Sequence, residues 1–362
     1  MLRQAAAQFL LEGVDIAAQP LGRGNINDTY LVTPAQGEAF VLQRINSRVF
    51  PKPLHIIANW RMYTTHARRK LSEQTAPRRW VLPELMPTRS GEYFWQDPSG
   101  ETWRAVHRVE GASPIAHIQS LEQAREVGIA LGIFHYLVSD LCPHSLHDTL
   151  PGFHVTPAYL QAYDRVLATP RRTVDTAEAR YCVGAIASRR AWASVLQEAH
   201  QRGELPLRVV HGDPKSDNIM LDKRSGQAVG IIDLDTLKPG LVQYDIGDCL
   251  RSSCNSLGES ALDYNRIHFD IDVAREILAG YLLTAGQLLT EADYAYLYDA
   301  IRLMAFECGL RFFTDYLEGD VYFKVRGAEH NLVRAVVQFK LVESIEAQAG
   351  EIQKMIATLR KP

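Results

Sequence analysis

The sequence predicts an α+β protein of two lobes, in which a small antiparallel β lobe with one helix is followed by a larger, mainly α-helical lobe. Three observations support this class. Strand-like runs separated by turn signals occupy residues 20–48 and 92–109. A helical pattern over residues 53–72 lies between those two strand regions. From residue 120 onward, apolar residues recur with helical spacing in long segments.

The first lobe is expected to span residues 1–110. Its opening segment, MLRQAAAQFLLEGVD, has the periodicity of an amphipathic helix. Hairpins follow, because the runs TYLV and AFVLQRI are separated by the turn PAQGE, and the runs EYFWQD and ETWRAVHRV by the turn DPSG. A short linker around Val109, Glu110 and Gly111 then leads into the second lobe.

The second lobe is expected to span residues 111–362. Helical patterns cover residues 122–141, 176–201, most of 261–318, and 330–358. Between these helices lies one strand-loop-strand block, LRVVHGDPKSDNIMLDKRSGQAVGIIDLDT, whose β-branched runs flank loops rich in Asp and Asn. We therefore expect the chemistry of the protein to be located in this block.

Bulk properties exclude several classes of partner. The 362 residues are 46% hydrophobic and 22% charged, as in ordinary globular proteins. The net charge of -3 provides no positive electrostatic field that would attract nucleic acid. No apolar run reaches the roughly 18 residues of a membrane span. Five cysteines without a CxxC pair argue against a disulfide scaffold or a zinc site. A reduced, cytoplasmic protein is expected, and its oligomeric state is left open.

The loop HGDPKSDN places Asp213 five residues before Asn218, directly after the apolar strand LRVV. Phosphoryl transfer needs a carboxylate that orients and deprotonates the attacking hydroxyl, and a neutral oxygen ligand that helps to hold a metal. Asp213 and Asn218 fit these two roles. The alternative is that both residues are only turn formers at a strand end.

A second acidic segment follows at IIDLD, where Asp233 and Asp235 stand at the end of an apolar strand. Strand alternation would direct both carboxylates to the same side. Mg²⁺ prefers a few hard carboxylate oxygens together with nucleotide phosphates and water. Asp233 is the predicted metal ligand, and Asp235 is a second ligand or a support.

Together, HGDPKSDN and IIDLD resemble the aminoglycoside phosphotransferase and choline kinase family, which is related to the protein kinases. The resemblance implies a bilobal, protein-kinase-like fold and an enzyme that uses ATP and Mg²⁺. It implies that Asp213 is the catalytic base and that Asn218 and Asp233 bind the metal. The segment YDIGD resembles a structural motif of the family, so Asp245 and Asp248 are expected to brace the loops.

Longer stretches resemble the N-acetylhexosamine 1-kinases, above all ECGLRFFTDYLEGDVYF and EHNLVR. This finer resemblance implies a sugar 1-kinase acting on the anomeric hydroxyl of GlcNAc or GalNAc, with Arg311 and Tyr322 as sugar contacts. Glu307, Arg311 and Asp315 recur every four residues and form one helix face. Glu307 or Asp315 could hold the Arg311 guanidinium, or the three could be only an ion-pair ladder.

The nucleotide is expected to bind the first lobe. The segment GRGNIN, with Gly24, Asn25 and Asn27, could bring backbone N–H groups to the phosphates, although a hairpin turn also uses glycine. Asn25 and Asn27 could also face the sugar. Where a protein kinase carries a phosphate-pairing lysine, this sequence has Gln43. A glutamine supplies no charge, so Arg44, Arg104 or the metal would neutralise the phosphates, and the linker with Val109 would contact the adenine.

Two other functions remain open at this stage. The acceptor could be an aminoglycoside, choline or another hydroxylated amine, although Arg311 argues against a cationic acceptor. Alternatively, the missing lysine could mark a nucleotide-binding regulator without catalysis, which the joint presence of Asp213, Asn218 and Asp233 disfavours.

Overall fold

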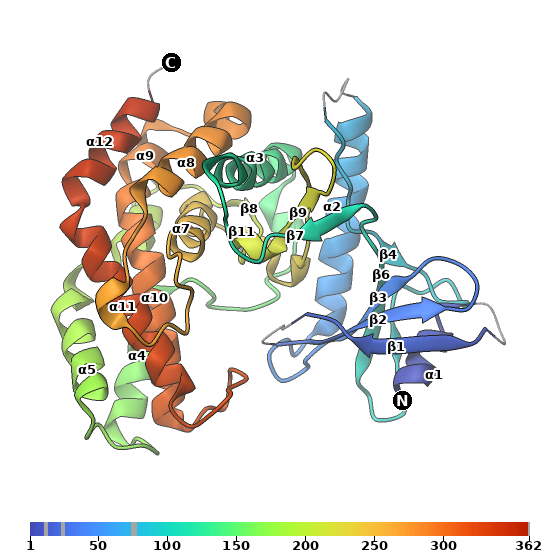
Figure 1. Cartoon of the computed structure of the whole chain (residues 1–362), viewed down its shortest axis with the longest axis horizontal. Helices are drawn as coiled ribbons and strands as arrows, with labels where there is room; N and C mark the ends of the chain where they lie inside the picture. Colours follow the sequence, from blue (N-terminus) through green and yellow to red (C-terminus); the bar gives the residue numbers. More distant parts are fainter. Residues whose placement is uncertain (11–13, 23–25, 74–77, 361–362) are drawn as a thin grey trace.

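The computed structural model describes residues 1–10, 14–22, 26–73 and 78–360, and it has two lobes (Figure 1). The first lobe is built on an antiparallel sheet with the strand order β1-β2-β3-β6-β4, and β5 also pairs with β6. These strands are β1 (Ile16–Pro20), β2 (Asp28–Pro34), β3 (Phe40–Arg44), β4 (Leu85–Met86), β5 (Trp95–Gln96) and β6 (Thr102–His107). The predicted antiparallel β lobe is confirmed.

The opening helix is shorter than predicted. Helix α1 (Leu2–Ala7) covers less than half of the fifteen-residue segment expected to be helical, and β1 begins at Ile16. The carbonyl of Gln8 accepts a hydrogen bond from the backbone N–H of Arg89 (2.9 Å), which fixes the chain against the sheet directly after the helix. Ala5 and Ala6 of the helix, together with Phe9 just after it, pack on the outer face of the sheet.

Helix α2 (Pro53–Ser72) matches the predicted range and lies between the sheet and the helical lobe (Figure 1). Its proline occupies the first turn, where a missing N–H costs nothing. Asn59 donates to the backbone carbonyls of His147 and Leu237, at 2.8 Å each. The helix is therefore hydrogen-bonded to the second lobe as well as packed against its own sheet.

The second lobe is mainly helical, as predicted, and contains two small β elements. Strands β7 (Ala112–Pro114), β9 (Ile219–Asp222) and β10 (Ala228–Ile231) form one sheet, and β8 (Arg208–Val210) pairs with β11 (Lys238–Gly240). Its helices are α3 (Leu121–Val138), α4 (Thr156–Ala168), α5 (Ala177–Arg189), α6 (Val195–Gln201), α7 (Val242–Ser253), α8 (Ile271–Ala285), α9 (Glu291–Ala295), α10 (Leu297–Glu318), α11 (His330–Ala347) and α12 (Ala349–Leu359).

Three details of this lobe differ from the sequence prediction. The single helix expected over residues 176–201 is interrupted between α5 and α6, and α4 and α7 were not expected. Helix α7 escaped the periodicity analysis because its buried positions include Asp245, Asp248 and Arg251. Buried charged residues hide the apolar stripe from which a helix is recognised. The division of the chain at residues 110 and 111 stays a prediction.

Helices α3 and α8 cross closely behind the catalytic block. A Cβ atom added at Gly128 of α3 would lie 1.8 Å from the carbonyl oxygen of Ile277 in α8, so only glycine fits there. This close crossing brings His135 of α3 to the hydroxyl of Tyr281 (2.9 Å). In the described part of the chain, no helix has the length and apolar character needed to cross a membrane.

Candidate active site

The candidate catalytic loop begins where β8 ends. Gly212 has a φ of +85°, and a Cβ there would lie 2.7 Å from the carbonyl oxygen of Thr236. Only glycine allows this close approach of the loop to the segment after β10. The hydroxyl of Thr236 donates to the carbonyl of His211 (2.8 Å), which joins the two acidic segments that the sequence singled out.

Asp213, Lys215 and Asn218 lie together in this loop. The Asp213 carboxylate accepts a hydrogen bond from Lys215 Nζ (2.7 Å), and both side chains are about one third exposed, at 31% and 34%. Burial would lower the pKa of Lys215, but the carboxylates of Asp213 and Asp233 raise it above its ordinary value. Lys215 is therefore a charged ammonium group beside the predicted base. The sequence analysis missed it, although it stands two residues after Asp213.

Asn218 is buried, and its Nδ2 donates to the backbone carbonyl of Asp213 (2.8 Å) and lies 3.5 Å from the Asp213 carboxylate. Because Nδ2 is turned toward Asp213, the amide oxygen Oδ1 points the other way. An amide oxygen in this orientation is a suitable metal ligand. The geometry is compatible with the predicted role of Asn218, which stays a prediction.

Asp233 and Asp235 do not lie on a strand, so the prediction that strand alternation directs both carboxylates to one side is wrong. Strand β10 ends at Ile231, Asp233 has a left-handed backbone with a φ of 67°, and residues 234–236 form a short 3₁₀ helix. A non-glycine residue in this region is strained, and such strain persists only where the surrounding structure enforces it. The two carboxylates are neighbours through this turn and not through the pleat of a strand.

The charge of Asp233 is poorly compensated. Burial, followed by the nearby carboxylate of Asp235, raises the pKa of Asp233 to about 7, even though Lys215 acts in the opposite direction. Closely spaced carboxylates that repel one another provide a natural site for a divalent cation. Within the described residues, no group of three or more His, Cys, Asp or Glu side chains could hold a metal ion. The two predicted ligands, the Asn218 amide oxygen and the Asp233 carboxylate, therefore fit a Mg²⁺ ion whose other ligands are nucleotide phosphates and water.

Asp235 connects the two lobes. Asn27 of the first lobe donates from Nδ2 to one oxygen of its carboxylate (2.5 Å), and Arg104 forms an ion pair with the other oxygen (2.5 Å). The oxygen that faces Arg104 accepts no hydrogen bond among the described residues, but both oxygens are contacted from the first lobe, which suits the supporting role that the sequence left open for this residue.

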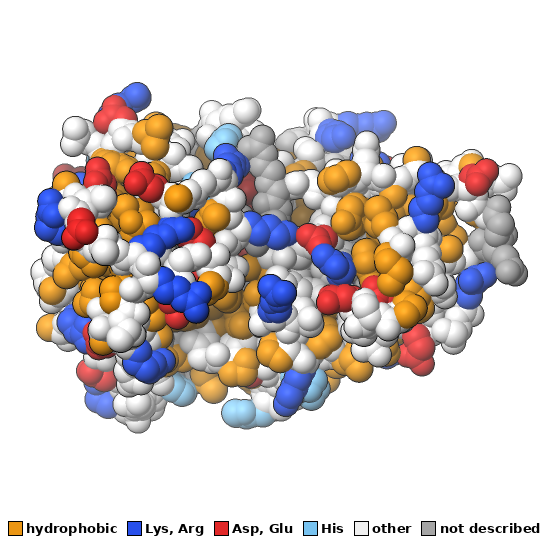
Figure 2. Space-filling view, turned by 90° about the horizontal axis from the view of Figure 1, so that it is seen from below, with side chains coloured by type: hydrophobic (Ala, Val, Ile, Leu, Met, Phe, Trp, Pro, Cys, Tyr) orange, Lys and Arg blue, Asp and Glu red, His pale blue; other side chains and the backbone are white. Residues whose placement is uncertain are grey.

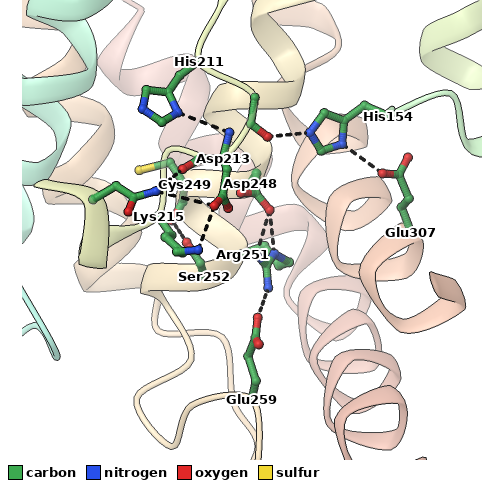
Figure 3. Close-up of polar contacts among 12 residues, drawn as sticks. His154, His211, Asp213, Lys215, Asp248, Cys249, Arg251, Ser252, Glu259 and Glu307 are labelled. Atoms are coloured by element: carbon green, nitrogen blue, oxygen red, sulfur yellow. Dashed lines mark hydrogen bonds and ion pairs between the residues drawn. The ribbon is translucent and has the colours of Figure 1, made fainter. Parts of the chain in front are cut away.

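Asp245 braces the catalytic loop as predicted, whereas the bonds of Asp248 go to Arg251 on the same helix. Asp245 accepts hydrogen bonds from the backbone N–H groups of His211 (2.7 Å) and Gly212 (2.8 Å). Asp248 forms an ion pair with Arg251 (2.7 Å), whose guanidinium also contacts Glu259 (Figure 3). Helix α7 thus holds the backbone of the catalytic loop from behind.

His154 braces the same loop from its other side and was missed by the sequence analysis. Its ring lies 2.9 Å from the carbonyl oxygen of Gly212 and 2.9 Å from the carboxylate of Glu307 on α10 (Figure 3). Glu307 also accepts from the hydroxyl of Thr156 (2.7 Å). Burial would lower the pKa of His154, but Glu307 raises it. The backbone of His154 has a φ of 65°. No local sequence pattern predicts the contact of His154 with Gly212.

Arg311 is framed by aromatic rings. Its guanidinium carbon lies 4.9 Å from the ring centre of Phe153, 5.4 Å from that of Tyr159 and 5.5 Å from that of Phe323. Glu307, which lies one helical turn before Arg311, is hydrogen-bonded to His154 instead. In the described part of the chain, Arg311 makes no hydrogen bond or ion pair with a carboxylate, so the possible ion-pair ladder along this helix face is absent.

Asp315 holds the segment that carries Tyr322. Its carboxylate accepts from the backbone N–H groups of Val321 (2.9 Å), Tyr322 (2.8 Å) and Phe323 (3.0 Å). Asp315 therefore orders the loop after α10 and does not hold Arg311. The side chain of Tyr322 is half-buried.

The loop after α10 also reaches the first lobe. Lys324 Nζ donates to the carbonyl of Asn27 (3.3 Å) and to the carboxylate of Asp28 (3.1 Å). In the view from below, Lys and Arg side chains, with Asp and Glu among them, gather over the middle of the molecule where the lobes meet (Figure 2). The segment that carries Tyr322 therefore meets Asn27 of the first lobe at this junction.

The predicted nucleotide residues are only partly brought together. Gly24 and Asn25 lie outside the described residues. Gln43 faces the inner side of the sheet with Arg104, whereas Arg44 points to the outer side, where it pairs with Asp28 and lies 6.0 Å from the ring centre of Trp103. Val109 is buried with Met220 and Val229. The structure thus does not place Arg44 with the other predicted nucleotide contacts.

A family model named the phosphotransferase enzyme family matches residues 17–281, which include the catalytic loop, Asp233 and most of α8. The chain belongs to this family. The match confirms the family resemblance that HGDPKSDN and IIDLD indicated, and it establishes the class of reaction as phosphoryl transfer. It does not extend to the segment with Arg311 and Tyr322.

Solved structures share the fold of this phosphotransferase along nearly its full length. A microcompartment-associated aminopropanol kinase is 16% identical, with a TM-score of 0.65 and coverage of 97% of this chain and 98% of that chain. An aminoglycoside phosphotransferase from Alicyclobacillus acidocaldarius is also 16% identical, with a TM-score of 0.61 and coverage of 99% and 95%. Spectinomycin phosphotransferase, solved with ADP and spectinomycin, is 12% identical, with a TM-score of 0.58 and coverage of 97% and 98%.

These similarities confirm the bilobal, protein-kinase-like fold. The names of these proteins indicate different acceptors. At such low identity, the similarity establishes the fold and not the acceptor. The acceptor of this phosphotransferase is therefore determined by its own side chains.

Proposed function

We propose that this phosphotransferase transfers the γ-phosphoryl group of ATP to a sugar hydroxyl, specifically the anomeric hydroxyl of an N-acetylhexosamine such as GlcNAc or GalNAc. The observation that carries the choice of acceptor is Arg311, a guanidinium surrounded by three aromatic rings, one of which belongs to Phe153, the residue before the loop-bracing His154. Arginine only donates hydrogen bonds, so its free N–H groups suit hydroxyl and carbonyl oxygens. Aromatic faces suit the apolar face of a pyranose.

The same arginine disfavours the amine alternative. A choline, amino alcohol or aminoglycoside acceptor carries positive charge and would be repelled by Arg311, which pairs with no carboxylate among the described residues. Sugar hydroxyls and an N-acetyl group are neutral and offer oxygens to the guanidinium. The half-buried Tyr322 is the second proposed sugar contact, and Asn25, which lies outside the described residues, stays a proposed contact.

In the proposed mechanism, Asp213 orients the sugar hydroxyl and accepts its proton as the oxygen attacks the γ-phosphorus of ATP, while the bond from that phosphorus to the bridging oxygen breaks and ADP leaves. Lys215, which lies 2.7 Å from Asp213, supplies positive charge close to the transferred group. Asn218 and Asp233 would hold Mg²⁺, which, when bound, offsets charge on the nucleotide phosphates. Asp245 and His154 fix the backbone of the loop, so that Asp213 does not need to reorganise during the reaction.

A panel of acceptors tests this proposal. ADP release would be measured with GlcNAc, GalNAc, glucose, aminopropanol, choline and kanamycin at a fixed ATP concentration. An N-acetylhexosamine is expected to give a kcat/KM about 100-fold above that of any amine, because differences of one or two well-placed hydrogen bonds produce ratios of this size. A preference for an amine would refute the sugar assignment. Tight ATP binding without turnover of any acceptor would favour the alternative that the protein is a nucleotide-binding regulator without catalytic activity.

Replacing Arg311 with Met is expected to raise the KM for the sugar about 10- to 100-fold, because a hydrogen bond to a charged group contributes roughly 1.5–3 kcal/mol. Methionine keeps most of the apolar stem between the rings, and the KM for ATP should stay within about twofold. Steady-state kinetics with each substrate varied in turn would measure both values.

The matched control is Arg302→Met on the same helix, which removes an arginine that pairs with Asp299. Its sugar KM should remain unchanged. If Arg311→Met instead raised the KM for ATP and left the sugar KM alone, Arg311 would belong to the nucleotide site.

A further inference from the structure

Strand β6 places an arginine directly opposite Gln43. The two residues are register partners in the antiparallel pair β3–β6, so their side chains emerge on the same, inner face of the sheet. Arg104 is fully buried, with an exposed fraction of 0%, and its guanidinium carbon lies 4.5 Å from the ring centre of Trp60 on α2. A charged group buried to this extent requires specific partners.

The first partner of Arg104 is the side-chain oxygen of Gln43. Nε and Nη2 of the guanidinium donate to Gln43 Oε1 at 3.0 and 2.8 Å. Because a guanidinium can only donate, the amide oxygen has to face Arg104 and the amide nitrogen has to face away. That nitrogen donates one hydrogen bond to the hydroxyl of Thr29 (3.2 Å), and among the described residues its second N–H has no partner.

The second partner of Arg104 is Asp235. Nη2 lies 2.5 Å from the carboxylate oxygen Oδ1, and Asp235 stands two residues after the predicted metal ligand Asp233. The other oxygen of Asp235 is held by Asn27, whose own Oδ1 accepts the backbone N–H of Asn46 (2.9 Å). One continuous chain of contacts therefore joins Gln43 on the sheet, through Arg104, to the acidic segment of the second lobe.

We propose that Arg104 is a positioning residue that fixes the amide of Gln43 with its N–H group toward the nucleotide phosphates, so that a neutral side chain serves where a lysine would otherwise stand. Being fully buried, Arg104 acts through Gln43 and does not touch the phosphates itself. The two N–H donors on Oε1 also polarise the amide, which strengthens the hydrogen bond that its nitrogen can donate. Asp235 balances the buried charge and sets its position relative to Asp233. This inference rests on the proposed use of ATP.

The decisive variant is Gln43→Glu, which keeps the shape of the side chain and an acceptor for Arg104. It replaces the amide N–H donors with a carboxylate oxygen that repels phosphate. The dissociation constant for ADP with Mg²⁺, measured by titration calorimetry, is expected to rise about 100-fold or more, because a donor is lost and like charges approach. The melting temperature should not fall, since the Arg104 pair becomes an ion pair. The sugar KM should stay within about twofold.

A double-mutant cycle tests the positioning role itself. Gln43→Ala is expected to weaken ADP binding about tenfold in the wild-type background and less than twofold in an Arg104→Met background, because an unoriented amide contributes little. Arg68→Met, which removes an exposed arginine of α2 paired with Glu84, is the matched control and should leave ADP binding unchanged.

The outcomes distinguish a failure of the Arg104 inference from a failure of the proposed function. Unchanged ADP binding in Gln43→Glu would overturn the inference, and so would additive effects in the cycle. If Arg104→Met does not fold, the cycle is run with Arg104→Lys, which keeps the buried positive charge beside Asp235 but not the paired N–H donors on Gln43 Oε1, and an undiminished effect of Gln43→Ala in that background would overturn the inference. Failure of the wild-type protein to bind ADP or ATP would overturn the proposed function instead, and the two failures are thereby distinguishable.

Discussion

Replacing Asp213 with Asn is expected to lower kcat about 10²- to 10⁴-fold, the range that a general base usually contributes. The amide has nearly the same shape as the carboxylate but cannot accept the proton of the attacking hydroxyl. Lys215 loses its anionic partner in this variant. The loop should nevertheless persist, because Asn218 keeps its hydrogen bond to the backbone carbonyl of residue 213. The KM values for ATP and acceptor should change less than tenfold, as ADP release with both substrates varied would measure.

Asp217→Asn is the matched control for this variant. Asp217 lies in the same loop, but its side chain is exposed and it has no place in the proposed mechanism. Its kcat should stay within about twofold of the wild-type value. If Asp213→Asn kept more than a tenth of the wild-type kcat, another group would have to be the base, and Lys215 would then be a bystander as well.

The chemical centre of this protein could be predicted because its residues are close in sequence. Asp213 and Asn218 are separated by a single short loop, and Asp233 follows one hairpin later. Residue types whose roles depend on such local spacing are recognisable from a pattern. The antiparallel lobe and α2 were predictable for the same reason, since their turns and periodicities are local.

The supports of that centre could not be predicted, because they join residues far apart in sequence. His154 meets Gly212 from a segment 58 residues away, and Arg104 reaches Asp235 in the other lobe. Such pairings depend on how the lobes and helices are placed, and the sequence gives no local sign of them. Asp315 illustrates the reverse error, since a convincing helical spacing suggested an ion pair whereas the carboxylate binds backbone N–H groups of the next loop.

The left-handed turn at Asp233 was unpredictable for a different reason. The run of apolar residues before it indicates a strand, and nothing in the residue types shows that the strand ends two residues earlier, at Ile231. Strained backbone at a site is stabilised by its surroundings and not by the local sequence. Sequence reasoning therefore identified the correct two carboxylates but gave them the wrong geometry.

Asp245→Asn is expected to be the most destabilising of the conservative changes, lowering the free energy of unfolding by about 3 kcal/mol or more, as when one partner of a buried charge network is removed. The carboxylate is fully buried and accepts hydrogen bonds from the N–H groups of His211 and Gly212 and from His135 Nε2 (2.9 Å). All three groups donate, so any orientation of an amide turns its NH₂ group toward at least one donor. Urea unfolding would measure the loss.

The pH dependence of this difference provides an internal check. Burial would raise the pKa of Asp245, but the bond from His135 and the other nearby donors bring it below its ordinary value. A carboxyl group whose pKa is lower in the folded state adds stability above its unfolded pKa and loses it as the pH falls through the folded one. The gap between wild type and Asp245→Asn should therefore be complete above about pH 5 and shrink below about pH 4, close to the ordinary carboxyl pKa.

Asp272→Asn controls for the loss of a charge as such. Asp272 is an exposed residue of α8 paired with Arg275, and its replacement should change stability by less than about 0.5 kcal/mol, as is usual for surface pairs. A loss below about 1 kcal/mol for Asp245→Asn would mean that the catalytic loop keeps its conformation without this brace. If stability fell as expected while kcat per folded molecule stayed unchanged, Asp245 would stabilise the fold without positioning Asp213, because a loop released from α7 should also lose the alignment of its base.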